Sequence, residues 1–335
     1  MANVKNEKKS GVNLYAIIIG TILVFYTISL FVPLLWGIMT SLKEKFDWGR
    51  PGTYLSLPDM QFWLDNAMMN AEAIAIGNDP PFANYDNLFG NYIRLFTHLQ
   101  IEAERSYYIG PNLDIFVDRK ETFGILGLTL NTLLYAGGTA LCGAMAPCIA
   151  GYLCSKFKYK FSGLIYSFVL FTMVMPIVGT TTAKLTLLRQ IGLYDTIYGM
   201  WIMNFSLSST NFLIFYALFS GISDTYSEAA QIDGASYFRI MWTIYMPLAI
   251  KTISTIFVLA FVVHYNDYNS ALLWIPTHPT LAYAVWFFAK GGDSKNDNVP
   301  FNLAAAMTLA MPMVIFFAIF KKKLMGDVSL GGIKE

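Results

Sequence analysis

The segment between residues 224 and 247 has residue types and a spacing that suit the docking of another protein rather than catalysis. Glu228 offers one charge to a basic group opposite, and the small side chains of Ala229 and Ala230 allow a close approach. The candidate residues for contact with a partner, called the pattern residues below, are Glu228, Ala229, Ala230, Asp233, Gly234, Ile244 and Pro247. We call this segment the docking loop (residues 224–247). The alternative is that residues 224–247 form an ordinary amphipathic loop with no docking role.

Local signals predict two short helices within the docking loop. Asp224 or Ser227 can cap a helix that runs through Ile232, and Gly234 supplies the left-handed residue that ends it. A second helix is expected to begin near Ser236. Its predicted inward stripe consists of Tyr237, Ile240, Met241 and Ile244.

A second group of polar residues lies inside long apolar stretches and could contact a polar solute. The candidates for a substrate path are Asn204, Ser208, Asn211, Asn266 and Asp267. The spacing of Asn204, Ser208 and Asn211 predicts one shared helix face. The alternative for these small polar groups is helix packing within lipid. The alternative for Asp267 is a structural pair with a basic group on another helix.

Composition excludes several other chemistries. The 23 basic residues nearly cancel the 22 acidic ones, which argues against a nucleic-acid binder. The chain has no Gly-Lys dipeptide, so it has no phosphate-binding loop of the Gly-x4-Gly-Lys-Ser/Thr type. Cys142, Cys148 and Cys154 are six residues apart and do not share a helical face, so we expect no metal site. No cofactor is expected on this chain, and we do not expect it to be an enzyme.

The elements that carry these residues are predicted to be membrane helices, because 55% of the chain is hydrophobic and only 13% is charged. The long apolar stretches are 14–39, 122–155, 161–183, 196–223, 252–273 and 298–320. About 20 helical residues cross a hydrocarbon core of about 30 Å, and each stretch is long enough. The prediction is an all-α integral membrane protein with six transmembrane helices.

Basic residues predict the orientation of these helices. The termini and the even connections hold twelve Lys and Arg, whereas the two short odd connections hold four. Both termini of a multi-pass protein are therefore expected in the cytoplasm. The predicted parts are a cytoplasmic N-terminus (1–13), a first transmembrane helix (14–40), an extracytoplasmic insert (41–121), a five-helix core (122–320) with the cytoplasmic docking loop, and a cytoplasmic tail (321–335).

The insert is expected to form a small, mostly helical outer subdomain. Residues 43–121 carry twelve acidic and seven basic side chains. Asp59 could cap one helix, and a second apolar periodicity runs from Leu88 to Leu99. Its two possible roles are to cover helix ends and to bind an external partner.

The docking loop resembles the EAA loop of ABC-importer permeases, which reads Glu-Ala-Ala, three residues, Gly, nine residues, Ile-x-Leu-Pro. Met246 stands here in place of the Leu. Further segments resemble the carbohydrate-uptake, maltose-type (MalG-like) permease family. They are Pro33-Leu34-Leu35-Trp36, Thr40-Ser41-Leu42-Lys43, Asn87-Leu88-Phe89, Asn131-Thr132-Leu133, Gly192-Leu193-Tyr194-Asp195-Thr196, Tyr265-Asn266-Asp267-Tyr268 and the tail from Gly326.

The resemblance implies a transport subunit without its own ATPase site. Its partners would be a second homologous permease (in a heterodimer), two cytoplasmic ATPase subunits that bind ATP and Mg, and an extracytoplasmic solute-binding protein that delivers a sugar. The resemblance also implies a multi-pass protein of the bacterial cytoplasmic (inner or plasma) membrane, surrounded by membrane lipid. The loop 274–297 would reach into the binding protein's cleft, or form an interfacial aromatic belt. The alternative functions are those of a stand-alone secondary solute carrier and of a non-transport membrane docking protein. The scarcity of intramembrane charge counts against the carrier.

Overall fold

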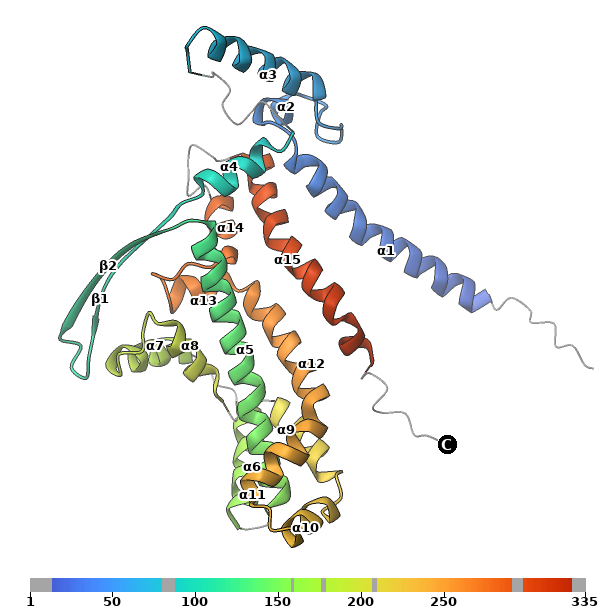
Figure 1. The fold of residues 1–335 in the computed structure, drawn as a ribbon, viewed down its shortest axis with the longest axis vertical. Helices are drawn as coiled ribbons and strands as arrows, with labels where there is room; N and C mark the ends of the chain where they lie inside the picture. The colour runs from blue at the N-terminus through green and yellow to red at the C-terminus, as the bar shows by residue number, and fades with distance from the viewer. Residues whose placement is uncertain are drawn as a thin grey trace, which may run out of the picture. The chain divides into compact units, whose positions relative to one another are not determined.

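The computed structural model describes residues 14–79, 88–157, 160–175, 179–206, 210–290 and 298–326. The chain divides into two compact units, one of residues 1–97 and 294–308 and the other of 98–293 and 309–335. The first unit contains α1 to α3, nearly all of α4 and the beginning of α15 (Figure 1). The second contains a β-hairpin, α5 to α14 and the rest of α15 (Val299–Gly326).

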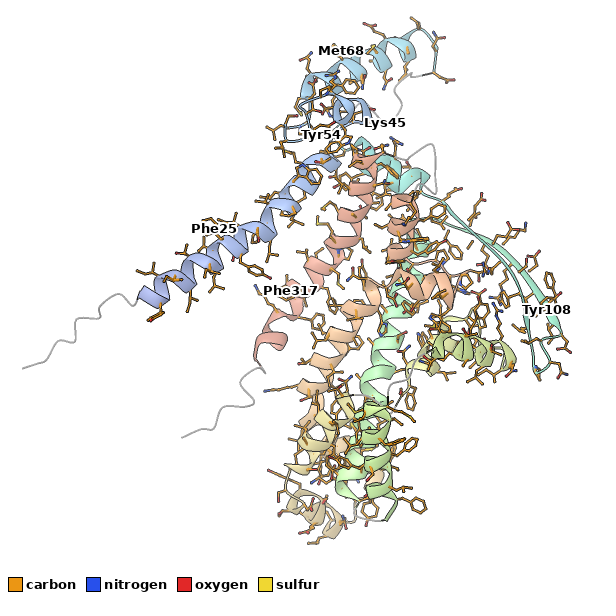
Figure 2. All side chains as sticks on the ribbon, turned by 180° about the vertical axis from the view of Figure 1, so that it is seen from behind. Phe25, Lys45, Tyr54, Met68, Tyr108 and Phe317 are labelled. Carbon is orange, nitrogen blue, oxygen red and sulfur yellow. The ribbon has the colours of Figure 1, made fainter. Side chains whose placement is uncertain are left out.

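The first unit begins with α1 (Leu14–Ser41), whose apolar side chains are mostly exposed. Phe25, for example, is 69% exposed (Figure 2). An apolar helix with such an exposed surface needs lipid or another chain around it. At the end of α1, the amide of Asn91 donates to the carbonyls of Ser41 (3.0 Å) and Lys43 (2.6 Å). Lys43 is fully buried, and that burial lowers its pKa.

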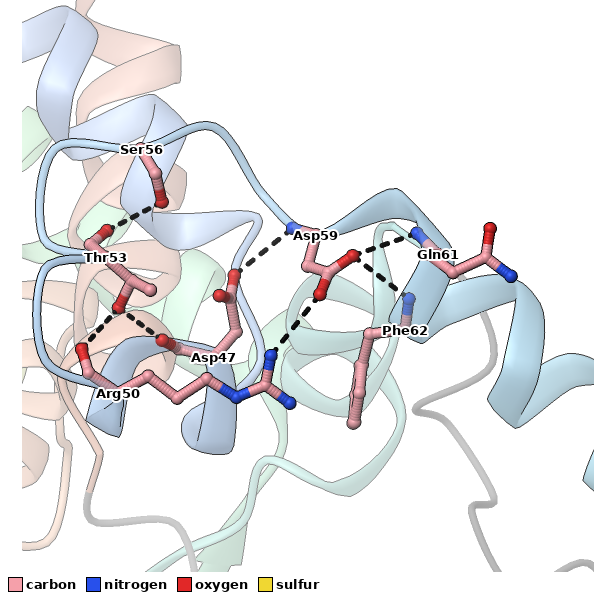
Figure 3. Close-up of polar contacts among 7 residues, drawn as sticks. All are labelled: Asp47, Arg50, Thr53, Ser56, Asp59, Gln61 and Phe62. Carbon is pink, nitrogen blue, oxygen red and sulfur yellow. Dashed lines mark hydrogen bonds and ion pairs between the residues drawn. The ribbon is translucent and has the colours of Figure 1, made fainter.

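The described part of the insert contains the two helices expected from the sequence, α3 (Met60–Ala75) and α4 (Gly90–His98). It also contains a short helix that was not expected, α2 (Lys45–Gly49). The predicted cap at Asp59 is confirmed, because its carboxylate accepts from the backbone N–H groups of Gln61 (3.1 Å) and Phe62 (3.3 Å) (Figure 3). Arg50 pairs with the same carboxylate at 3.4 Å. The start of α3 is therefore tied to the turn after α2. Asn87 lies outside the described residues.

The prediction of an all-α protein is wrong for residues 101–123. They form an antiparallel hairpin of β1 (Ile101–Ile109) and β2 (Ile115–Phe123), with Ile101 opposite Phe123 and Ile109 opposite Ile115. Ile101, Ala103 and Tyr107 on one face are buried, while their neighbours on the other face are exposed. This alternation is the period of a strand. Because β2 extends to Phe123, the next helix begins at Ile125 rather than at 122.

The second unit is built around α5 (Ile125–Lys156), which contacts α8 (Ile197–Asn204), α9 (Thr210–Ser220) and α12 (Met246–Tyr265). Gly151 allows the close approach of α9, because a Cβ there would lie 2.9 Å from the backbone nitrogen of Tyr216. Aromatic rings join α12 to the end of α15, with Phe261 and Phe316 at 4.7 Å. The docking loop lies at the far end of this bundle from the hairpin (Figure 1).

Four helices in the described part of the chain are long and apolar enough to span a membrane. They are Ile17–Ser41, Ile125–Lys156, Tyr237–Tyr265 and Val299–Lys321. Phe161–Val174 and Thr210–Ser220 are shorter apolar helices. The stretches 161–183, 196–223 and 252–273 are each divided between two helices. The pairs are α6 (Lys160–Val174) with α7 (Thr180–Gln190), α8 with α9, and α12 with α13 (Tyr268–Leu273).

Candidate docking loop and substrate path

The docking loop forms the two helices predicted for it. α10 (Thr225–Ile232) is followed by Gly234 at φ 77°, in the left-handed region that glycine adopts without strain. α11 (Tyr237–Ile240) is capped by Ser236, whose hydroxyl accepts from the N–H of Arg239 at 3.4 Å. The loop is thus a helix, a hinge and a second helix.

The pattern residues of the docking loop are largely available to another protein. α10 has no buried residue. Glu228, Ala229, Asp233, Gly234 and Pro247 are exposed, and Ala230 and Ile244 are half-buried. Large apolar side chains are exposed beside them, namely Tyr226, Ile232, Tyr237, Phe238 and Trp242. Exposed apolar groups of this size are typical of an interaction surface.

A π-helical turn, η1 (Met241–Tyr245), continues α11 into α12. Pro247 has no N–H to donate to the carbonyl of Thr243, so a widened turn is favoured just before it. The predicted inward stripe is therefore wrong in part. Ile240 and Met241 are buried as expected, but Tyr237 is 59% exposed and Ile244 is half-buried. The wider turn instead buries Tyr245 and Met246.

Lys156, at the end of α5, anchors the docking loop to the bundle. Its ammonium donates to the carbonyl of Ile222 (2.5 Å) and to the carboxylate of Asp224 (2.7 Å), and it lies 5.2 Å from the ring centre of Tyr245. The Lys156 side chain is 8% exposed. Asp224 stands at the N-cap of α10 as predicted, but its carboxylate binds Lys156 instead of capping the helix.

Aromatic packing completes this anchor. The ring of Tyr152 lies 5.0 Å from that of Tyr245 and 5.6 Å from that of Phe219. Phe157 contacts Tyr237 at 5.3 Å. These rings join α5, α9 and the docking loop in one cluster. Sequence reasoning missed Lys156, which it counted only as a basic residue for orientation. The available signal was its place at the end of a membrane helix, where a paired charge is needed.

The substrate-path candidates occupy different environments. Asn211 on α9 lines a groove between α9 and α12, together with Thr252, Thr255 and His264. The groove encloses about 740 Å³ and is otherwise lined by six aliphatic side chains. A pocket of this kind, mostly apolar with a few polar groups, is typical of small-ligand sites.

Asn204 lies on α8, and its amide donates to the carbonyl of Met200 at 3.0 Å. Because α8 ends at Asn204 and α9 begins at Thr210, the helical spacing that predicted a shared face does not run from Asn204 to Asn211. Ser208 lies outside the described residues.

Asn266 and Asp267 lie at the break between α12 and α13. The amide of Asn266 donates to the carbonyl of Val262 (2.9 Å). Asp267 caps α13, accepting from the N–H of Ser270 (3.1 Å), from its hydroxyl (2.5 Å) and from the hydroxyl of Tyr135 (3.2 Å). Among the described residues, the hydrogen bonds of the Asp267 carboxylate are therefore to a serine and a tyrosine, and none is to a lysine or an arginine.

A family model and two named proteins are similar to this chain. The family model described as "Binding-protein-dependent transport system inner membrane component" matches residues 143–324, which include the docking loop and the groove. The Melibiose/raffinose/stachyose import permease protein MelC of Bacillus subtilis is 25% identical over 249 residues, covering 72% of this chain and 90% of MelC. The Trehalose/maltose transport system permease protein MalG of Thermococcus litoralis is 25% identical over 212 residues, covering 61% of this chain and 74% of MalG.

The fold also resembles a solved structure. It is a chain from the crystal structure of a bacterial ABC transporter involved in the import of the acidic polysaccharide alginate. The TM-score is 0.63 at 18% sequence identity, with 96% of this chain and 99% of that chain covered. The family match spans more than half of the 335 residues. The chain therefore belongs to the family of binding-protein-dependent transport system inner membrane components and is a permease subunit of an ABC importer.

Proposed function

We propose that this permease imports a carbohydrate, specifically a di- or oligosaccharide, and that the docking loop receives the movement of a cytoplasmic ATPase. Relatives named for melibiose, raffinose and stachyose or for trehalose and maltose support the substrate class. The groove of Asn211, Thr252, Thr255 and His264 suits a sugar, because it offers hydrogen-bonding groups beside an apolar wall.

The observation that carries the coupling role is the exposure of the docking loop combined with its attachment. α10 buries none of its own residues, so it is available to a partner. The loop is nevertheless tied by Lys156 to α5, which packs against both walls of the groove. A movement of Glu228 or Gly234 is thereby transmitted through the Lys156–Asp224 ion pair and an aromatic cluster to the helices that line the path.

The complete importer in this proposal contains a second, homologous permease, two ATPase subunits that bind ATP and Mg, and an extracytoplasmic binding protein. The six apolar stretches all cross the membrane, and both termini lie in the cytoplasm. The insert then lies outside, and the docking loop lies inside beside the ATPases. Asn204, Ser208, Asn211, Asn266 and Asp267 remain the proposed path residues.

Glu228→Lys tests the docking loop directly. Glu228 is exposed on α10, so its replacement leaves the membrane fold intact while reversing the charge that faces the ATPase. Sugar uptake by the reconstituted complex is expected to fall by at least about tenfold, the effect of losing a charged hydrogen bond of about 1.5–3 kcal/mol. Glu72→Lys, the same exchange at an exposed position of α3, serves as the control. Normal uptake by Glu228→Lys would contradict the proposal.

A further inference from the structure

A buried carboxylate outside the docking loop and the groove connects three separate segments of the second unit. Asp195 is fully buried in the turn between α7 and α8. Its backbone has φ 58°, in the left-handed region, where aspartate is found more often than most non-glycine residues. An enclosed carboxylate needs several partners to offset its desolvation.

The carboxylate bonds to the loop between α13 and α14 (Leu281–Ala289), and the hydroxyl of Tyr107 on β1 also donates to it. The N–H of Thr277 donates to Oδ1 at 3.0 Å, and its hydroxyl donates to Oδ2 at 2.7 Å. His278 Nδ1 lies 3.6 Å from Oδ1. The N–H of Asp195 also donates to the carbonyl of Trp274 at 3.0 Å. The 274–278 segment is thus held at four points by one residue.

The hairpin is attached to the same turn. The guanidinium of Arg119 on β2 donates to the carbonyl of Asp195 at 3.4 Å. On β1, the ring of Tyr107 packs edge-on against Tyr194 at 4.8 Å, and burial raises the pKa of Tyr107 to about 12. The N–H of Gly110 donates to the carbonyl of Arg189 at 3.0 Å. Since a two-stranded hairpin is only marginally stable alone, this turn determines where the hairpin lies.

The 274–278 segment lies close in the chain to the proposed path. Trp274 follows α13, which has only six residues and begins at the Asp267 cap. Immediately before that cap, α12 ends near His264, a residue of the groove. On its other side the loop is fixed to α5, because Asn131 donates to the carbonyl of Pro279 (3.1 Å) and the N–H of Leu281 donates to the hydroxyl of Thr132 (2.8 Å).

We propose that Asp195 is a positioning residue that makes the hairpin, the α7–α8 turn and the 274–280 loop move as one body, so that docking of the loaded binding protein alters the break between α12 and α13. The inference rests on the proposed function, because it takes this end of the chain to be extracytoplasmic. Asp195 contacts neither the groove nor the docking loop. Its effect is therefore on the response to the binding protein, and not on ATP hydrolysis itself.

The test compares Asp195→Asn with Asp118→Asn in the complete reconstituted transporter. Asn keeps the size of the side chain but presents an NH2 group to one of the Thr277 donors, which leaves a buried donor unpaired. Asp118 undergoes the same chemical change on the exposed face of the hairpin, where it accepts only from Ser106 among the described residues (2.7 Å). The two measurements are ATP hydrolysis without binding protein and its stimulation by sugar-loaded binding protein.

For Asp195→Asn we expect unchanged basal hydrolysis and about tenfold weaker stimulation, the loss that corresponds to a hydrogen bond to a charged group. Asp118→Asn should behave like the wild type. Equal stimulation in both variants would overturn the inference. If Asp195→Asn fails to assemble, Thr277→Val decides by the same criteria, since it removes only the hydroxyl partner. A wild-type transporter that shows no stimulation at all would instead refute the proposed function.

Discussion

The two ends of the second unit use an aspartate in opposite ways. At the docking loop, Asp224 is half exposed and pairs with one buried lysine, Lys156. At the hairpin end, Asp195 is fully buried and bonds to the α13–α14 loop through both of its oxygens. One end leaves its polar residues exposed, and the other end uses them to hold its own segments together.

This difference indicates how a permease can receive force at one end and respond at the other. The docking loop has a glycine hinge and is attached to α5 through the ion pair of Lys156 and Asp224, so it can adjust to a partner. The hairpin end has many short-range bonds, so it moves as a body. α5 joins the two ends, because it carries Lys156 at one terminus and Asn131 and Thr132 near the other.

The largest effect is expected for a substitution that disturbs the packing of α5, the helix that joins the two ends. In Gly151→Ala the new Cβ would lie 2.8 Å from the Cβ of Phe215 and 2.9 Å from the nitrogen of Tyr216, so α9 must shift. We expect a loss of about 1–3 kcal/mol in the free energy of unfolding, measured as a lower melting temperature of the purified transporter. Gly143→Ala, on the same helix with no heavy atom within 4 Å of its new Cβ, should melt at or above the wild-type temperature. Equal melting of the two variants would refute close α5–α9 packing.

A smaller effect is expected from Lys156→Met, which removes only the attachment of the docking loop to α5. The substitution leaves the Ile222 carbonyl and the Asp224 carboxylate without their ammonium partner. We expect a loss of about 1–2 kcal/mol in unfolding free energy, reduced by the exposure of Asp224, and more ATP consumed per sugar imported. Lys184→Met, at an exposed position of α7, is the matched control. An unchanged ratio of ATP to sugar in Lys156→Met would show that the anchor does not carry the coupling.

The smallest effect concerns the groove that lies between the two ends. Asn211→Ala removes one amide from the groove, and we expect about a threefold change in the apparent affinity for sugar during transport. Asn204→Ala should change it less, because the Asn204 amide already bonds within its own helix. Indistinguishable affinities for the wild type and Asn211→Ala would remove Asn211 from the path.

The sequence predicted the elements whose signals are local. The long apolar stretches correspond to α1, α5 and α15 within a few residues, apart from the C-terminal extension of α15, and the cap at Asp59 and the hinge at Gly234 are where they were expected. Each of these features depends on residues next to one another in the chain. The order of the helices and the exposed docking loop could therefore be predicted.

Features that depend on distant residues could not be predicted. The apolar alternation of Ile101, Ala103 and Tyr107 is interrupted by the charged Arg105. The hairpin also packs against Tyr194, which is 87 residues beyond Tyr107. The break after Asn204 lies in an uncharged stretch, where composition does not distinguish one helix from two. The partner of Asp195 is Thr277, 82 residues away, and no local pattern relates them.

The central claim is that ATP hydrolysis by another subunit drives import through this permease. The most direct measurement is uptake of labelled sugar into liposomes that contain this chain and its companion permease, with binding protein supplied and with active or hydrolysis-deficient ATPase subunits. The account predicts accumulation against a gradient only with the active ATPase. Accumulation by the permeases without any ATPase would contradict it.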